Sequence, residues 1–339
     1  MRVIVDAFGG DNAPLEIIKG AAMAAREYGH EILLTGDEEQ IRRVAAENGI
    51  SLDKMEIIHA PDVIAMDDEP RSILKEHKEC SMAEGLRQLA AGNGDAFVTA
   101  GSTGAMIMGA TFIVKRIKGV SRAALAPIMP SNKGVFMLLD SGANAECRPE
   151  MLAQFAHMGS LYMEAVMERP VTVGLINIGT EDCKGGALQQ ETFSLLKNSD
   201  LNFIGNVEAR DIPFGTADVL VADGFTGNVV LKLMEGVTDA LLKNIKSIFM
   251  TNLKTKIAAL LVKPQLGGFK KKMDTSEYGG APLLGVSKPV IKTHGNSKAA
   301  SVKHAIRVAA TFANAGVIEK ITDAVQAENA KTEEQVGVE

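Results

Sequence analysis

The sequence predicts an α/β protein, a three-layer α/β/α sandwich built on a mixed, mostly parallel sheet, with a pair of helices projecting from it. Short apolar runs rich in β-branched residues alternate along the chain with stretches whose apolar residues recur at helical spacing. Five predicted strands end in polar loops that contain glycine, as is typical of strand-to-helix connections in parallel sheets. Two further strands are separated only by Pro130-Ser131-Asn132, which predicts a hairpin and therefore a mixed sheet.

Composition excludes several classes of function. Of the 339 residues, we expect 1–325 to form a single large domain and 326–339, which are polar and charged, to form a disordered tail. The net charge of −6 and the absence of tryptophan argue against binding of nucleic acid. Three scattered cysteines predict reduced thiols in the cytoplasm and no disulfide framework. The first residues show no signal-peptide pattern.

The chain opens with a predicted strand at residues 2–6, a glycine loop and a helix that begins near Pro14. Turn or capping chemistry is the alternative to ligand binding for the polar residues of this loop. The next predicted elements are strands at 30–35 and 55–59 and helices at 38–48 and 70–91. Candidate phosphate-binding residues around the first loop are Asp6, Gly9, Gly10, Asp11 and Asn12.

Residues 95–105 carry the most informative pattern of strand, small-residue loop and helix. A strand at 96–99 is followed by the loop Ala100-Gly101-Ser102-Thr103-Gly104 and a helix at 105–118. This geometry points unpaired backbone N–H groups at an anion. No Walker lysine follows, and the spacing is not G-x-G-x-x-G, so the loop favours a bare phosphate over a nucleotide. The alternative is a tight turn that binds nothing. The candidates are Gly101, Ser102, Thr103 and Gly104.

Three more polar loops follow predicted strands in the second half of the chain. The predicted hairpin covers 123–139, further strands cover 171–178, 202–206, 218–222, 283–286 and 290–293, and helices cover 149–168, 187–196 and 298–315. Because ligands bind outside the carboxyl ends of strands in open α/β sheets, we expect the loops to line one cleft. Their candidate residues are Asp140, Asn144, Lys184, Asp223, Asn228 and, after the last strand, His294.

Residues 229–273 predict an amphipathic helical pair with a break near Thr251-Asn252. No acidic residue occurs between Asp239 and Asp274, whereas eight lysines do. An apolar stripe flanked by lysines is typical of a helix that meets a membrane surface or an acidic partner. A dimer interface with solvated lysines is the alternative, and both can hold if the base forms the interface and the tip meets lipid. The predicted contact residues are Lys254, Lys256, Leu260, Leu261, Val262, Leu266 and Phe269.

Common catalytic motifs are absent. The chain has no H-E-x-x-H, C-x-x-C or G-x-S-x-G, and no metal site is predicted. Lys184 in its glycine loop is either a clamp for a phosphate or oxyanion, or a surface lysine. His294 is either a general acid or base, or a capping residue.

Strings spread over nearly the whole chain resemble the bacterial acyl-ACP:phosphate acyltransferases (the PlsX family). The similarity begins with Asp6-Ala7-Phe8-Gly9-Gly10-Asp11-Asn12-Ala13-Pro14, although the family often has Met where this chain has Phe8. The other matching strings are at residues 100–105, 140–144, 149–156, 177–181 with 184–185, 205–208, 223–229, 278–285 and 294–297.

The resemblance implies that inorganic phosphate attacks the acyl thioester of acyl carrier protein and yields an acyl phosphate for phospholipid synthesis. It also implies a homodimer with a fold like that of the isocitrate and isopropylmalate dehydrogenases and the phosphotransacetylases. No metal or organic cofactor is expected. The family is cytoplasmic and peripherally membrane-associated, and acts before a membrane acyltransferase.

For this chemistry we assign the loop at 101–104 to the phosphate, Lys184 as cationic clamp and His294 as acid or oxyanion partner. Asn144 and Asn228 are expected to orient groups, and Asp140 and Asp223 to tune their neighbours. Two enzyme alternatives share the fold, a phosphotransacetylase acting on acyl-CoA and a dehydrogenase of the isocitrate type, but we find no carboxylate cluster or nucleotide site for the latter. A non-enzymatic membrane-surface protein is the third alternative.

Overall fold

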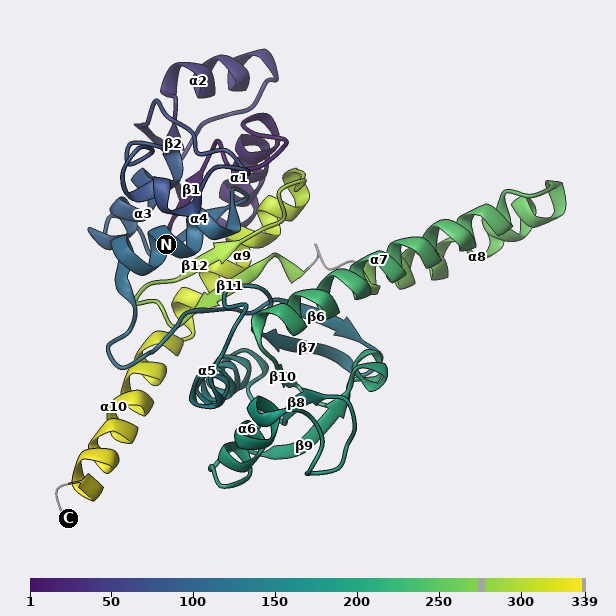
Figure 1. Cartoon of the computed structure of the whole chain (residues 1–339). Helices are drawn as coiled ribbons and strands as arrows, with labels where there is room; N and C mark the ends of the chain where they lie inside the picture. The colour runs from purple at the N-terminus through teal and green to yellow at the C-terminus, as the bar shows by residue number, and fades with distance from the viewer. Residues whose placement is uncertain (274–277, 337–339) are drawn as a thin grey trace.

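Two β-sheets form the frame of the computed structural model, which describes residues 1–273 and 278–336 (Figure 1). The larger sheet has the strand order β3-β2-β1-β4-β12-β11-β5. It is parallel from β3 to β12, whereas β11 is antiparallel to both β12 and β5. Its strands are β1 (Arg2–Asp6), β2 (Glu31–Gly36), β3 (Met55–His59), β4 (Ala96–Thr99), β5 (Ala124–Leu125), β11 (Ala281–Leu284) and β12 (Val290–Lys292).

The smaller sheet has the order β6-β7-β10-β8-β9 and is parallel except for the β6–β7 hairpin. The α/β class with mixed, mostly parallel strands is confirmed, and so is the hairpin, but the strands divide into two sheets. The chain passes from the larger sheet to the smaller one at residues 126–127. Ala126 N still donates to Pro282 O of the larger sheet, whereas Pro127 O accepts from Leu138 N of the smaller sheet. The strands are β6 (Ile128–Ser131), β7 (Gly134–Leu139), β8 (Val173–Asn177), β9 (Phe203–Glu208) and β10 (Val219–Val221).

Helices cover both sheets. The helix predicted at 70–91 is divided into a 3₁₀ turn (Pro70–Leu74) and α3, because Cys80 adopts an extended conformation and its sulfur accepts from Ala83 N as an N-cap. The helix predicted at 105–118 is α4 followed by a π-helical turn (Ala110–Lys115). The packed α-helices are α1 (Leu15–Tyr28), α2 (Glu38–Glu47), α3 (Ser81–Ala90), α4 (Thr103–Gly109), α5 (Pro149–Met167), α6 (Ala187–Lys197) and α9 (Ala299–Asn314).

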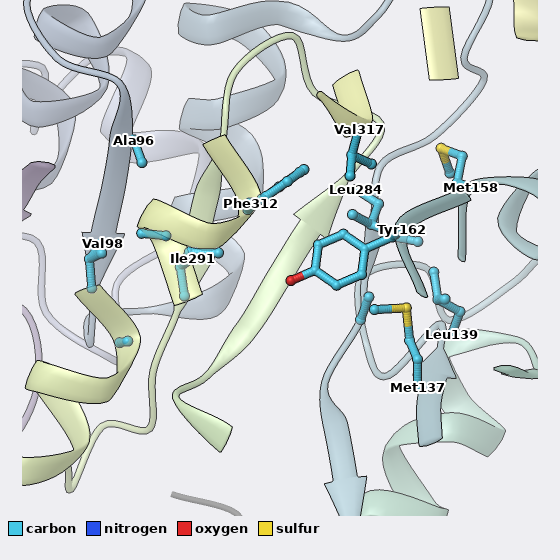
Figure 2. Close-up of a cluster of buried hydrophobic side chains, with 14 of the residues drawn as sticks. Ala96, Val98, Met137, Leu139, Met158, Tyr162, Leu284, Ile291, Phe312 and Val317 are labelled. Carbon is cyan, nitrogen blue, oxygen red and sulfur yellow. The ribbon is translucent and has the colours of Figure 1, made fainter. Parts of the chain in front are cut away.

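One hydrophobic cluster joins the two sheets. It contains buried residues of the larger sheet, such as Val98 and Ile291, and of the smaller sheet, such as Leu139. Between them, Tyr162 of α5 meets Phe312 of α9 edge to face, with ring centroids 5.2 Å apart (Figure 2). Because this core is continuous, the two sheets hold the cleft between them in a defined geometry.

Helices α7 (Gly224–Phe249) and α8 (Leu253–Met273) form the predicted pair and project far from the sheets (Figure 1). The predicted break is confirmed, since the two helices are separated by residues 250–252. At 1.5 Å per residue, α7 is about 39 Å long. Only its first turns are buried, and large apolar side chains farther along both helices are exposed.

Helix α10 (Val317–Val336) extends the chain where a disordered tail was predicted from residue 326. The residues from 326 to 336 are rich in alanine, glutamate and glutamine, which favour helix even without an apolar face. Among the described residues, no helix combines the length and the apolar character needed to cross a bilayer.

Candidate functional site

A cavity of about 400 Å³ lies between the two sheets, at the carboxyl ends of their strands and beside the base of α7. Its lining includes both apolar side chains and polar or charged ones. The apolar side chains are those of Met66, Leu125, Pro127, Ile128, Met129, Leu231 and Ala281. The polar and charged side chains are those of Thr103, Ser141, Asn228, Lys232, Glu235, Lys292, Thr293 and His294.

His294 is placed in this cavity by the end of β12, and its side chain is 41% exposed. Its Nε2 lies 3.3 Å from Glu235 Oε1 of α7. The other oxygen of Glu235 accepts a hydrogen bond of 2.9 Å from Lys232, one helical turn earlier. The predicted histidine is therefore in the cleft, and α7 supplies a carboxylate and an ammonium beside it.

Lys292 is the last residue of β12 and directly precedes Thr293 and His294, which also line the cavity. Only 8% of Lys292 is exposed. Its Nζ donates to Ala100 O at 3.2 Å and to Thr293 O. The parallel register pairs Lys292 with Thr99, so the ammonium lies against the loop predicted to hold phosphate. Burial lowers the pKa of Lys292 to about 8, and repulsion from Lys232 acts in the same direction.

The loop after β1 is held by hydrogen bonds rather than open to a ligand. Asp6 is buried and accepts from Ser81 Oγ at 2.6 Å and from Thr99 Oγ1 at 2.7 Å. Burial raises the pKa of Asp6 above its ordinary value. Gly9 and Gly10 pack so closely that an added Cβ would lie 2.6 Å from Gly101 N and 2.7 Å from Gly295 O, respectively.

Asp11 and Asn12 support the loop that carries His294. Asp11 N donates to Gly295 O at 2.8 Å, and Asn12 Nδ2 donates to Asn296 O at 3.0 Å. Neither residue lines the cavity. Both residues position the histidine loop, in agreement with the turn chemistry that was the alternative for them.

In the loop after β4, only Thr103 lines the cavity. Gly101 N already donates to Thr99 Oγ1 at 2.9 Å, and Ser102 Oγ caps α4 by accepting from Ala105 N at 3.5 Å. Gly104 packs against Pro70, where an added Cβ would lie 2.6 Å from Pro70 Cγ. Of the four residues predicted to hold phosphate in this loop, Thr103 is thus the one that lines the cavity.

Asp140 is fully buried and joins the two sheets. Its carboxylate accepts from Leu125 N at 2.9 Å and from Asn144 N at 2.6 Å, and Asn144 Nδ2 reaches Asp140 and Ala123 O. Burial raises the pKa of Asp140. Asp140 and Asn144 lie outside the lining and hold the loop whose Ser141 and Gly142 form part of the wall.

Asp223 and Asn228 have different positions at the start of α7. Asp223 caps the helix by accepting from Thr226 N at 2.9 Å, and it does not line the cavity. Asn228 lines the cavity, close to Gly142. Of the two, only Asn228 is placed to contact a ligand directly.

Lys184 does not line this cavity. It lies in the loop after β8, its side chain is 43% exposed, and its Nζ is 3.7 Å from Glu181 Oε1.

Sequence reasoning did not identify Lys292, Lys232 and Glu235 as site residues. A lysine that directly follows Val290 and Ile291 in a buried strand is nevertheless an unusual pattern.

No group of three or more His, Cys, Asp or Glu side chains able to hold a metal ion occurs within residues 1–273 and 278–336.

Comparisons with known proteins place these features in context. A family model described as "Fatty acid synthesis protein" matches residues 1–320. A protein named "Phosphate acyltransferase" from Clostridium novyi is 45% identical over 328 residues, which is 96% of this chain and 99% of the relative. A protein of the same name from Alkaliphilus oremlandii is 44% identical over 326 residues, 96% of this chain and 97% of the relative.

Among solved structures, the fold is similar to that of a phosphotransacetylase from Streptococcus pyogenes. The TM-score is 0.62 at 17% sequence identity, with 94% of each chain covered. At this identity the likeness concerns the fold alone, and it agrees with the phosphotransacetylase-like architecture that the sequence predicts.

Proposed function

We propose that this chain, which belongs to the fatty acid synthesis protein family of phosphate acyltransferases, takes its acyl group from the thioester of an acyl carrier protein. Phosphate acyltransfer follows from membership of the family. The identity of the acyl donor is the proposed part, and the acyl phosphate formed is the precursor for phospholipid synthesis.

The observation that carries the proposal is that the cavity lining combines polar and apolar side chains. Lysine, histidine, threonine, serine, asparagine and glutamate side chains line it together with leucine, isoleucine, methionine and proline side chains. A small oxyanion suits the lysine, histidine, threonine and asparagine side chains, and the first carbons of an acyl chain suit the apolar ones. A site that holds both reactants side by side gains the large rate advantage of proximity.

The chemistry needs no enzyme nucleophile. An oxygen of hydrogen phosphate attacks the thioester carbon, the C–O bond forms, the C–S bond breaks, and the proton of the phosphate ends on the carrier sulfur. The presence of Thr103 and Asn228 in the lining supports a role in holding phosphate or the tetrahedral oxyanion, and that of His294 supports a role in moving the proton. The leaving thiol has a pKa of about 8.5 by analogy with cysteine, so it needs modest acid assistance.

A thiol-release assay tests this function. The enzyme is incubated with acyl carrier protein thioester with and without inorganic phosphate, and free thiol and acyl phosphate are measured. We expect thiol release only with phosphate, in equal amount to acyl phosphate. Release at the same rate without phosphate, or none with it, would contradict the proposal. A parallel arm with acyl-CoA separates this function from that of a phosphotransacetylase.

Lys184 stays a proposed cationic residue of the reaction. Since its side chain lies outside the cavity, this role requires its loop to move or a second copy of the chain to present it. The Lys184→Ala variant tests it, because near-normal thiol release from a folded variant would remove Lys184 from the mechanism.

The projecting helices are proposed to serve association. Exposed Leu233, Val237 and Leu241 of α7 support a homodimer interface near its base. At the far end, Leu260 and Leu261 are 70% and 75% exposed, which supports peripheral contact with membrane, with the carrier protein or with a downstream membrane acyltransferase. Further members of this tip are Lys254, Lys256, Val262, Leu266 and Phe269, of which Leu266 is half-buried and the others are exposed.

A further inference from the structure

Lys292 is a buried ammonium without an anionic partner among the described residues. No carboxylate of that part of the chain lies within ion-pair distance of its Nζ. Two of its three N–H donors meet the carbonyls of Ala100 and Thr293, which leaves one donor without a described protein acceptor. Burying a charge without a counter-ion is costly, so such a group is typical of a site completed by an anion.

The surroundings of Lys292 suit a small oxyanion. Its side chain lines the cavity together with Thr103, a hydroxyl donor at the start of α4, the helix that follows β4. Lys232 of α7 lines the same cavity and interacts electrostatically with Lys292. Thr103, Lys232 and Lys292 thus bring one hydroxyl and two ammonium groups to the cavity, and among its described lining residues the one carboxylate is that of Glu235, which pairs with Lys232.

We propose that Lys292 is the residue that anchors inorganic phosphate for attack on the acyl group, beside the loop at 101–104 to which the sequence assigned the phosphate. This inference rests on the proposed function and adds the residue that binds its nucleophile. The buried ammonium also orients the phosphate, because its own position is fixed by the two carbonyls.

The anchor makes phosphate binding depend on pH. The pKa of Lys292 is lowered to about 8, so the free site loses its charge above that pH, and a bound dianion favours the charged form. The charged or titratable groups that face Lys292 are Lys232 and Glu235 of α7, His294 after β12, and Asp6 and Asp11 around the loop after β1. Of these, Lys292 is the one whose lowered pKa predicts weaker phosphate binding above pH 8.

Three variants test the anchor by steady-state kinetics and by calorimetric titration with inorganic phosphate. Lys292→Met removes the charge, Lys292→Arg keeps it at every pH, and Lys288→Met is the matched control, an exposed lysine two residues before the start of the same strand. We expect Lys292→Met to raise the KM and Kd for phosphate at least about tenfold while the KM for acyl carrier protein thioester changes less than about threefold. Lys288→Met should match the wild type.

The pH dependence of the wild type provides an independent measurement if Lys292→Met does not fold. Phosphate affinity should fall by up to about tenfold per pH unit above pH 8 in the wild type and remain nearly constant in Lys292→Arg. Unchanged phosphate affinity in folded Lys292→Met, or a flat wild-type profile, would overturn the proposal. Calorimetry needs no acyl donor, so failure of the proposed reaction with intact phosphate binding is distinguished from failure of the anchor.

Discussion

His294 Nε2 lies 3.3 Å from Glu235 Oε1, and this contact joins the end of β12 in the larger sheet to the base of the projecting helix α7. Glu235 Oε1 accepts no hydrogen bond from the described residues, while its other oxygen is held by Lys232. This helix therefore forms a wall of the cavity and, about 39 Å long, extends to the break at residues 250–252. The tip residues lie beyond that break on α8, so a partner bound there is connected to the site through α8, the break and α7.

Replacing His294 tests its role in proton transfer. We expect His294→Ala to lower kcat about 100-fold, because general acid–base groups commonly contribute 10² to 10⁴. Thiol release under saturating phosphate is the measurement. His157→Ala is the control, since His157 lies on α5 and does not line this cavity. A folded His294→Ala enzyme with kcat within threefold of the wild type would show that the imidazole moves no proton in the slow step.

Gly227 permits a close approach of α7 to the loop after β7. A Cβ added there would lie 1.8 Å from Asp140 O, so Gly227→Ala must displace the helix or the loop. We expect the unfolding free energy to fall by about 3 kcal/mol and phosphate acyltransfer to be lost.

Gly236→Ala, in the same helix, is the control for Gly227. An added Cβ at Gly236 meets nothing within 4 Å, so this variant should gain up to about 1 kcal/mol from helix propensity. Urea denaturation measures both changes. Equal stability of the two variants would contradict the packing described here.

Asp6 should make stability depend on pH. Burial raises its pKa above 3.8, so between 3.8 and the raised value the folded chain keeps a proton that the unfolded chain has lost. The unfolding free energy then falls by about 1.4 kcal/mol for each pH unit in that window. Asp6→Asn is neutral throughout and should lack this part of the slope. Urea denaturation between pH 4 and 7 checks this, and parallel curves for the two proteins would refute it.

The tip of the helical pair should bind vesicles that contain anionic lipid. We expect the double variant Leu260→Ser, Leu261→Ser to sediment with such vesicles at least about fivefold less than the wild type, because two exposed leucines lose their apolar contact. Leu195→Ser, an exposed leucine on α6, is the control. If the double variant instead keeps vesicle binding and raises the KM for the carrier protein, the tip binds the carrier.

Local patterns in the sequence determined the α/β class, most strand and helix positions, the β6–β7 hairpin and the break between α7 and α8. These follow from apolar periodicity and turn residues within a few positions, which act before any distant contact forms. The same patterns identified the glycine loops, including those that bring Thr103, Asn228 and His294 into the cavity.

Only the tertiary structure decided which polar residues meet. Strand β12 lies between β4 and β11, and this places Lys292 beside Ala100, 192 positions away in the chain. Asp140 turns inward to join the sheets, while Lys184 lies in a loop away from the cavity. Strand order depends on how whole apolar faces pack against one another. The sequence around a single residue does not contain that information, so it could identify polar loops but not the cation among them.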